Sequence, residues 1–321
     1  MNLKISILAA AAVAMSSAGY AQQQQNFDKV EVHVLPVQGN VYMLVGAGGN
    51  ITLQAGKDGV LLVDTMYAAL NEKVVAAIRT VSKGPIRYII NTHMHADHTD
   101  GNEKMAKLGA TIAGGNVMQL SDAAVGAAVI AHENVLNRMT AQKPALPFGM
   151  LPTDTYFTNK KELFFNGEAI QILYQGNAHT DGDSMVFFRR SDVVSTGDVF
   201  TPGNFPIIDL DHGGSFNGLI ASLNRIIDLT VPAEKQEGGT YVIPGHGRLC
   251  DEADVVEYRD MATIIRDRIQ DMVKKGMTLE QVKAAKPTRD YDPLYGSTTG
   301  FWTTDKFVEA AYKSLSQSAK K

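Results

Sequence analysis

Short apolar runs separated by polar turns dominate the first part of the chain. Each run is followed by Gly, Asn or Asp, which is typical of β-strands joined by tight turns. The runs cover residues 30–35, 41–45, 51–54 and 60–63. We therefore expect this part of the chain to form a meander of antiparallel strands.

The next segment changes to a helical period. Leu70, Val74, Ile78 and Val81 recur every three to four residues, with polar side chains between them. A short apolar strand at 88–90 follows and runs directly into a polar segment. The order strand, helix, strand predicts a crossover unit with its functional groups at the carboxyl end of the second strand.

The rest of the chain gives further helices and strands in a similar order. We expect helices at 102–108, roughly 117–139, 217–229 and 252–275, strands at 163–165, 169–174, 185–188, 193–195 and 241–243, and a loop at 144–158. Asn166-Gly167 between two of these strands is a strong hairpin signal. Two face-to-face sheets with helices outside would bury these apolar runs. No Pro- or Ser-rich linker divides residues 22–321, so we expect one α/β domain.

Composition and charge narrow the class of protein. The 321 residues are 45% hydrophobic and 20% charged, which excludes a disordered chain or a coiled coil. Lys and Arg number 30 against 34 Asp and Glu, so no basic excess favours nucleic acid, and we expect a small-molecule substrate. Cys250 is the only cysteine, so a metal site would need histidine and carboxylate ligands. We interpret Cys250 as a packed thiol.

The first 21 residues have the pattern of a signal peptide. Lys4 precedes an apolar run at 5–15, and Gly19-Tyr20-Ala21 provides small residues for cleavage. The alternative is an uncleaved membrane anchor, but the run is short for a bilayer span. The pattern predicts export to the periplasm or the medium, with no membrane attachment after cleavage.

One polar segment carries the strongest chemical signal. His93, His95, Asp97 and His98 lie within six residues, directly after the strand at 88–90. Period two would place His93 and His95 on one side, and the following turn could aim Asp97 and His98 the other way. Neutral imidazole suits zinc, and carboxylate is a common further ligand. Groups that face two directions favour two adjacent metal ions.

One segment cannot complete two coordination shells, so other ligands must come from elsewhere. His179, Asp198 and His246 each follow a predicted strand and lie near glycines, which permit close backbone approach. Asp64 also ends an apolar strand. It would either orient a metal ligand or cap the following helix, and both roles remain open.

This set of residues resembles the metallo-β-lactamase superfamily over roughly residues 30–250. The resemblance implies a four-layer αββα sandwich of two mixed β-sheets, with two zinc ions at one edge. It places the first ion on His93, His95 and His179 and the second on Asp97, His98 and His246. Asp198 would bridge both ions or bind the second.

The resemblance also bears on the reaction. The export signal and the spacing from His179 to Asp198 are similar to those of secreted β-lactamases. Asp198 stands where one β-lactamase subclass has cysteine, and His98 together with Asp198 is the pattern of glyoxalase II-like thioesterases and lactonases. The leading hypothesis is a secreted zinc hydrolase that cleaves the β-lactam amide by a metal-bound hydroxide, formed from a water that Asp97 orients and deprotonates. The alternatives are a thioesterase or lactonase, an iron-dependent persulfide dioxygenase and a non-catalytic metal-binding module.

Several weaker signals concern the surroundings of the site. Phe148, Phe157 and Phe205 fall in predicted loops near the metal edge, where they would line the pocket or pack the loops. Residues 213–215 precede a helix and would either present backbone N–H groups to an anion or form a plain junction. Of the histidines outside the cluster, His212 is the one expected near the site. Trp302 and Tyr312 are expected to anchor a C-terminal helix in the core.

Overall fold

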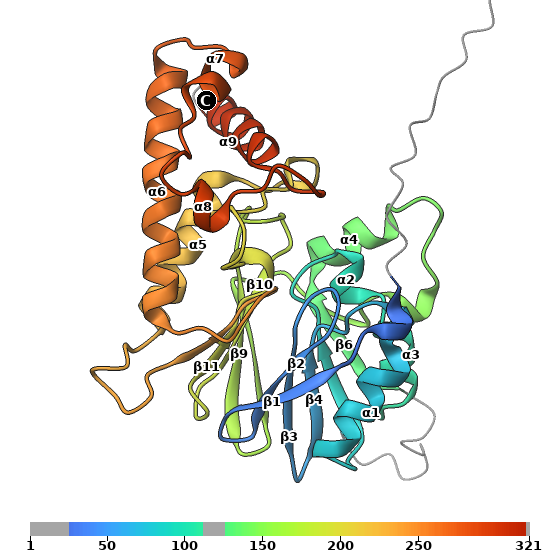
Figure 1. Ribbon diagram of the computed structural model, residues 1–321. Coiled ribbons are helices and arrows are strands. Elements are labelled where there is room, and N and C mark those ends of the chain that lie inside the picture. The colour runs from blue at the N-terminus through green and yellow to red at the C-terminus, as the bar shows by residue number, and fades with distance from the viewer. Residues whose placement is uncertain (1–25, 112–125, 319–321) are drawn as a thin grey trace, which may run out of the picture.

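The computed structural model describes residues 26–111 and 126–318. Two β-sheets pack face to face, and helices cover the outer face of each sheet (Figure 1). This arrangement is the predicted four-layer αββα sandwich. The predicted signal peptide lies outside the described residues. No helix in the described part of the chain is both long and apolar enough to cross a membrane.

The first sheet contains seven strands in chain order. They are β1 (His33–Gln38), β2 (Val41–Val45), β3 (Ile51–Gly56), β4 (Gly59–Val63), β5 (Ile86–Ile90), β6 (Ala128–His132) and β7 (Asp154–Tyr156). The strands β1 to β4 form the expected antiparallel meander. From β4 to β7 neighbouring strands are parallel, so the sheet is mixed.

The second sheet contains five strands in the order β12-β11-β10-β9-β8. They are β8 (Lys160–Phe165), β9 (Glu168–Tyr174), β10 (Ser184–Phe188), β11 (Val193–Ser195) and β12 (Tyr241–Ile243). Only β11 and β12 pair in parallel. Asn166 and Gly167 join β8 to β9 with φ of 51° and 82°. Both residues adopt the left-handed region that a tight hairpin turn needs, which confirms the predicted hairpin.

The helices divide between the two outer faces of the sandwich. They are α1 (Asn71–Val81), α2 (Ala96–Thr99), α3 (Asn102–Lys107), α4 (Glu133–Thr140), α5 (Phe216–Leu229), α6 (Glu252–Lys274), α7 (Leu279–Ala285), α8 (Asp292–Tyr295) and α9 (Thr304–Ser318). In Figure 1, α1 and α3 lie beside the first sheet, and α5 and α6 lie beside the second. Helix α9 packs against α5, α6 and α7.

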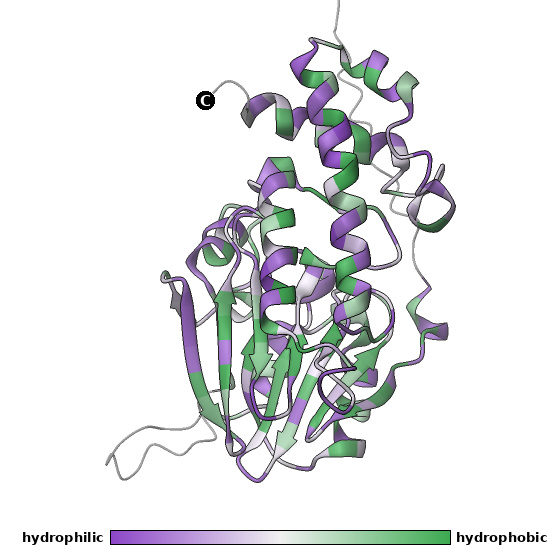
Figure 2. Ribbon diagram, turned by 90° about the vertical axis from the view of Figure 1, so that its left-hand side faces the viewer, coloured by the Kyte–Doolittle hydropathy of each residue, from purple (hydrophilic) through white to green (hydrophobic). Residues whose placement is uncertain are grey.

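Alternation along the strands divides the core into layers. Leu61 and Val63 of β4 belong to the apolar cluster between the two sheets. Their neighbours Val60 and Leu62 point to the opposite face and belong to the cluster that includes Val74 of α1. Period two along a strand therefore supplies two apolar layers from one run of residues. Figure 2 shows the same concentration of hydrophobic residues in the strands behind the helices.

Three predicted elements differ from the structure. The predicted helix at 117–139 is wrong at 128–132, which form β6, and only Glu133–Thr140 is helical in the described part. Continuous apolar runs do not distinguish a strand buried on both faces from a helix. Residues 117–125 of that prediction lie outside the described residues. The predicted loop at 144–158 contains β7, which pairs with β6, and β1 begins at His33 rather than at residue 30.

Candidate metal centre

The predicted metal ligands converge at one edge of the sandwich, although they are far apart in the sequence. His93 and His95 follow β5, Asp97 and His98 lie on α2, His179 lies between β9 and β10, Asp198 follows β11, and His246 follows β12. Each side chain is thus held at the end of a strand or in the segment that follows it. Both sheets contribute, so the site lies where their edges meet.

The ligand atoms gather in two groups. One comprises His93, His95, His179 and Asp198, and the other comprises Asp97, His98 and His246, with the atoms of each group within 4.8 Å of one another. His95 Nδ1 lies 3.0 Å from His179 Nε2, and His98 Nε2 lies 3.3 Å from His246 Nε2. Tetrahedral ligands of a zinc ion lie about 3.3 Å apart when each metal–nitrogen bond is about 2.0 Å. The spacing of these nitrogens therefore fits zinc.

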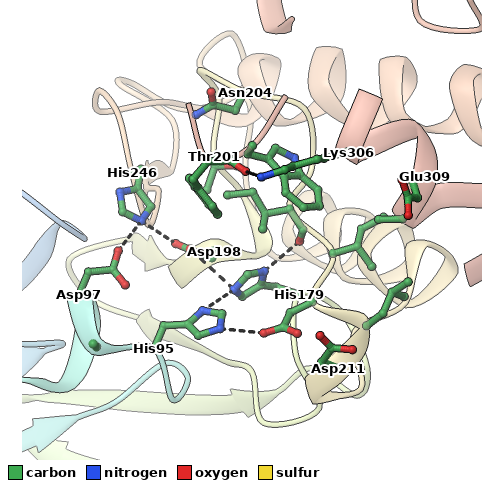
Figure 3. Close-up of a pocket in the computed structure, with 18 of the residues that line it drawn as sticks. His95, Asp97, His179, Asp198, Thr201, Asn204, Asp211, His246, Lys306 and Glu309 are labelled. Atoms are coloured by element: carbon green, nitrogen blue, oxygen red, sulfur yellow. Dashed lines mark hydrogen bonds and ion pairs between the residues drawn. The ribbon is translucent and has the colours of Figure 1, made fainter. Parts of the chain in front are cut away.

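Asp198 lies between the two groups and faces both (Figure 3). Its Oδ1 is 3.3 Å from His98 Nε2 and 3.4 Å from His246 Nε2. Its Oδ2 is 3.9 Å from His93 Nε2 and 3.8 Å from His179 Nε2. One carboxylate thus offers one oxygen to each group, which is the arrangement required of a bridging ligand.

Two buried atoms indicate that the site is built for cations. His93 Nε2 and Asp198 Oδ1 are buried and form no hydrogen bond to the described residues. Buried polar atoms in proteins are nearly always paired, so an unpaired donor or acceptor calls for an ion or water. Imidazole nitrogens that face each other and a buried carboxylate also match zinc chemistry. These residues fit a metal ion, and the buried His/Asp clusters form a metal-binding site.

Asp64 fixes the orientation of two imidazoles. His98 Nδ1 donates to Asp64 Oδ2 at 2.8 Å, which leaves Nε2 facing the site. The Thr92 hydroxyl donates to the same carboxylate at 2.8 Å and accepts from His93 Nδ1 at 3.0 Å. These proton positions follow from the hydrogen-bond network. Asp64 therefore orients ligands; it does not cap α1, which begins seven residues later, at Asn71.

The other two histidines of the first group also have their far ring nitrogen held by a hydrogen bond. His179 Nδ1 donates to the Ile207 carbonyl at 2.9 Å. His95 Nε2 lies 2.8 Å from Asp209 Oδ2, which also contacts His212 Nδ1 at 2.6 Å. The sequence analysis missed Asp209, for which the spacing Asp209-x-x-His212 was the available signal. His212 lies near the site as predicted, its ring centroid 6.2 Å from that of His95.

Burial governs the charge of the first group. It holds the pKa of His93 well below the ordinary value and lowers the pKa of His179 to about 4. Burial also lowers the pKa of His95, but the hydrogen bond to Asp209 and the charges of Asp198 and Asp209 together outweigh it and raise that pKa. His93 and His179 are therefore neutral near pH 7, the form in which imidazole binds metals.

Carboxylates govern the charge of the second group. Burial lowers the pKa of His98, but Asp198 and Asp97 outweigh that effect and raise it well above the ordinary value. The same two carboxylates overcome burial at His246 and raise its pKa to about 9. This group thus attracts positive charge, which a proton or a metal ion can supply.

The ligands differ in their access to solvent. The side chains of His95, Asp97 and His246 are 29%, 21% and 31% exposed, whereas those of His93 and His98 are 1% and 0% exposed. The exposed three line a pocket of about 1110 Å³. A substrate would therefore approach the metal-binding site from this side.

Of the two roles left open for Phe148, Phe157 and Phe205, lining this pocket is wrong. Phe148 and Phe157 are 82% and 75% exposed and do not line it. Phe205 is buried in the core and stacks on Phe307 with ring centroids 4.8 Å apart. Phe301 and Trp302 line the pocket instead. Trp302 is partly buried and packs, like Tyr312, against the apolar cluster that includes Phe307 of α9, so both anchor the C-terminal helix as the sequence predicted.

Two further predictions are decided by the local structure. Ser215 caps α5 by accepting from the Gly218 N–H at 3.3 Å, and residues 213–215 do not line the pocket, so this segment is a plain junction. Cys250 is buried, and burial raises the pKa of its thiol to about 12. It is a packed thiol, as expected.

Comparison with known families gives the class of protein. A model of the metallo-beta-lactamase superfamily matches residues 37–246. The chain belongs to this superfamily, and with its buried His/Asp clusters it is a metal-dependent hydrolase. A search of curated proteins finds no match.

Solved structures with the same fold include enzymes of more than one specificity. The metallo-beta-lactamase from Pontibacter korlensis is 15% identical, with a TM-score of 0.55 over 73% of this chain and 99% of its own. The DIM-1 metallo-beta-lactamase is 18% identical, with a TM-score of 0.53 over the same shares. A double mutant of the sec-alkyl sulfatase PisA1 from Pseudomonas sp. is 16% identical, with a TM-score of 0.65 over 88% of this chain. This chain spans 50% of the length of the sulfatase chain.

Proposed function

We propose that this protein is a two-zinc hydrolase whose leading substrate is the amide bond of a β-lactam ring. The observation that carries the proposal is the position of Asp198, with one oxygen toward each ligand group. Such a carboxylate can hold two ions a few ångströms apart. The structural likeness to two β-lactamases, which covers 99% of each of their chains, supports the choice of substrate.

The residues of the chain divide the work at the site. Zinc ions held by the two groups would act as Lewis acids that polarise a carbonyl and lower the pKa of water toward about 7. His93, His95 and His179 would hold the first ion, and Asp97, His98 and His246 the second. Asp97 approaches His246 and His98 through Oδ2, at 3.2 Å and 3.7 Å, which leaves Oδ1 for water. That oxygen is free to accept a proton from water at the site.

Asp97 carries the negative charge that a general base requires. Burial raises its pKa, but the neighbouring His98 and His246 outweigh burial and lower it. The carboxylate is therefore ionised at neutral pH and can act as a general base. At 21% side-chain exposure it also faces the pocket, where it could orient an incoming water molecule.

A second candidate is the hydrolysis of a thioester, lactone or sulfate ester. The combination of Asp198 with His98 favours a thioester or a lactone, because it resembles the pattern of glyoxalase II-like thioesterases and lactonases. The likeness to the sulfatase covers 88% of this chain, against 73% for the β-lactamases, and this larger coverage favours a sulfate ester. Persulfide oxidation would require iron in place of zinc.

A substrate panel on metal-analysed protein tests the proposal. A chromogenic cephalosporin, a thioester, a lactone and an alkyl sulfate should be offered to wild type and to His93→Ala. We expect turnover of the cephalosporin and two zinc ions per chain in wild type. Catalytic activity should fall more than about 100-fold in His93→Ala, because removing only the hydrogen-bond partner of a metal ligand already costs about 10–100-fold in metal affinity or activity. If the protein turns over only another member of the panel, that compound class replaces the β-lactam as the proposed substrate. Bound iron in place of zinc would contradict the proposed hydrolase.

We infer export from the signal-like segment at 1–21, with a small molecule as substrate and no nucleic-acid or membrane partner. Cell fractionation tests the location. We expect the protein in the periplasm or the medium, with a new N-terminus near residue 22. Retention in the cytoplasm with residues 1–21 still attached would contradict the inference.

A further inference from the structure

The two sheets of the sandwich end in four edge strands, and three of these edges are protected against pairing with another chain. Pro36 lies within β1, and a bulge interrupts that strand between Pro36 and Gln38. β7 contains only three residues, and the backbone of Cys250 pairs with Val242 on the open side of β12. Proline, bulges, short strands and covering segments are common means of protecting a sheet edge. The fourth edge strand, β8, has six residues and no proline, and among the described strands it pairs with β9 alone.

Every second residue of β8 directs its backbone groups away from β9. The Asn159 carbonyl accepts from the Tyr174 N–H at 3.0 Å, in the register that continues along β8 and β9. Residues that bond to one antiparallel neighbour alternate along a strand, so the odd-numbered residues of β8 bond to β9. The even-numbered residues turn their N–H and C=O groups to the open edge. These outward residues are Lys160, Glu162 and Phe164.

Two exposed aromatic side chains flank this edge. Phe164 lies on β8 and is 78% exposed, and Phe157, three residues before β8, is 75% exposed. Exposed apolar side chains beside unpaired backbone groups favour the addition of a further strand. The edge of β8 therefore has the properties of an interaction surface.

The charges on β8 indicate which strand could pair with it. Charged side chains can protect an edge strand by repelling a second one. On β8, however, Lys160 and Glu162 have opposite signs, project from the same face and are 57% and 52% exposed. A second copy of β8 that runs antiparallel can therefore place Lys160 of each copy opposite Glu162 of the other.

We propose that two copies of this chain associate through β8, antiparallel and about a two-fold axis at Lys161. This position of the axis places both Lys160–Glu162 pairs opposite each other, whereas an axis at Glu162 would oppose two like carboxylates. The outward N–H and C=O groups of the two strands then pair, and the two five-stranded sheets become continuous. The inference does not depend on the proposed reaction, because β8 contributes no residue to the pocket at the metal centre.

The same register accounts for the other side chains of the edge. Phe164 of one copy approaches the segment that carries Phe157 of the other, so both rings lose exposure to solvent. The two Lys161 side chains meet at the axis on the opposite face of the strand. Within each copy Lys161 pairs with Asp154 at 2.7 Å, which neutralises its charge.

Self-association of the wild-type protein is the first test. Analytical ultracentrifugation over about 1 µM to 1 mM protein covers the range of weak to moderate affinity, and we expect a dimer fraction that rises with concentration. Amide hydrogen exchange then locates the contact. The N–H groups of Glu162 and Phe164 should exchange more slowly in the dimer, whereas that of Leu163, which already bonds to β9, should change little. A monomer over the whole range, or unchanged exchange at both outward residues in the dimer, would overturn the proposal.

Charge reversal tests the register. Lys160→Glu and Glu162→Lys each oppose like charges at both pairs, so each variant should self-associate about tenfold more weakly than wild type. Mixed together, the two variants present opposite charges at both pairs and should form a mixed dimer. Lys275→Glu is the matched control, since it reverses an exposed lysine that pairs with Asp271 at 2.6 Å, and it should dimerise like wild type.

The mixed dimer also guards against a trivial loss of folding. An unfolded variant could not be rescued by mixing, and circular dichroism checks the fold of each variant separately. A dimer that survives both charge reversals would place the contact on another surface and overturn the proposal. Folded single variants that stay monomeric when mixed would overturn the register and with it the proposed interface.

Discussion

Each imidazole of the first ligand group presents one nitrogen to the site because a hydrogen bond occupies the other. Thr92, the Ile207 carbonyl and Asp209 provide these bonds for His93, His179 and His95. The partner decides which nitrogen is free: Nε2 for His93 and His179, and Nδ1 for His95. Side chains that never touch a metal ion therefore determine the geometry of its ligands.

The contact between Asp209 and His95 gives a prediction at this scale. Asp209→Ala should free the His95 ring to rotate and weaken zinc binding by the first group about 10–100-fold. Chelator competition measures this affinity directly. Asp211→Ala is the matched control, because it removes an exposed carboxylate two positions away that has no contact with His95. Equal zinc affinity in wild type and Asp209→Ala would show that the contact does not position the ring.

At the scale of elements, the ends of neighbouring strands determine which side chains meet. β11 and β12 pair in parallel, so Asp198 and His246 emerge from the same end of the second sheet. β5 ends beside β4, which brings His98 on α2 close to Asp64. Strand pairing thus assembles residues that lie far apart in the sequence.

The turn after β12 leaves no space for a side chain. A Cβ on Gly245 would overlap Asp198 Oδ1 and the backbone of Gly197. Gly245→Ala should displace the Asp198 carboxylate, reduce the amount of bound metal and destabilise the fold by about 1–3 kcal/mol. Metal analysis and thermal unfolding measure these effects. Gly203→Ala is the control, since its Cβ would meet no atom within 4 Å; a similar loss in both variants would contradict the argument.

At the scale of the whole molecule, the two sheets place ligand groups of different charge side by side. In the first group burial keeps His93 and His179 neutral, whereas in the second group carboxylates hold protons on His98 and His246. The C-terminal helices close one side of the pocket above both groups. The metal ions should therefore differ in how strongly protons compete for their ligands.

This difference predicts a pH dependence of metal content. Without metal, His98 and His246 hold protons at neutral pH, with the pKa of His246 raised to about 9. A metal must displace these protons, so its affinity falls as pH decreases below about 9, by about tenfold per unit for each proton. In the first group burial lowers the pKa of His93 and His179, and only that of His95 is raised.

Dialysis over a pH series with metal analysis tests this order. We expect two zinc ions at about pH 8 and loss of the second-group ion first as the pH approaches about 6. His246→Ala should bind one ion with a shallower pH dependence. Loss of both ions together, with equal slopes, would contradict the assignment of charge to the two groups.

The sequence by itself determined the elements whose pattern is local. The antiparallel meander, the hairpin at Asn166-Gly167 and the helix beginning near residue 70 follow from periods and turn residues that neighbours supply. The density of ligands from His93 to His98 also lies in one short segment, so it could be recognised without coordinates. The strand β6 could not be recognised from the sequence, because an apolar run has the same appearance in a buried helix and in a central strand.

Only the tertiary structure decided what surrounds the metal centre. It buried Phe205 in the core, left Phe148 in solvent and brought Trp302 and Lys306 to the pocket from the far end of the chain. It also placed Asp209 against His95. Local sequence patterns report the side on which a residue lies within its own element. Which distant element it then meets depends on how the sheets and helices pack, and that packing decided the neighbours of the ligands.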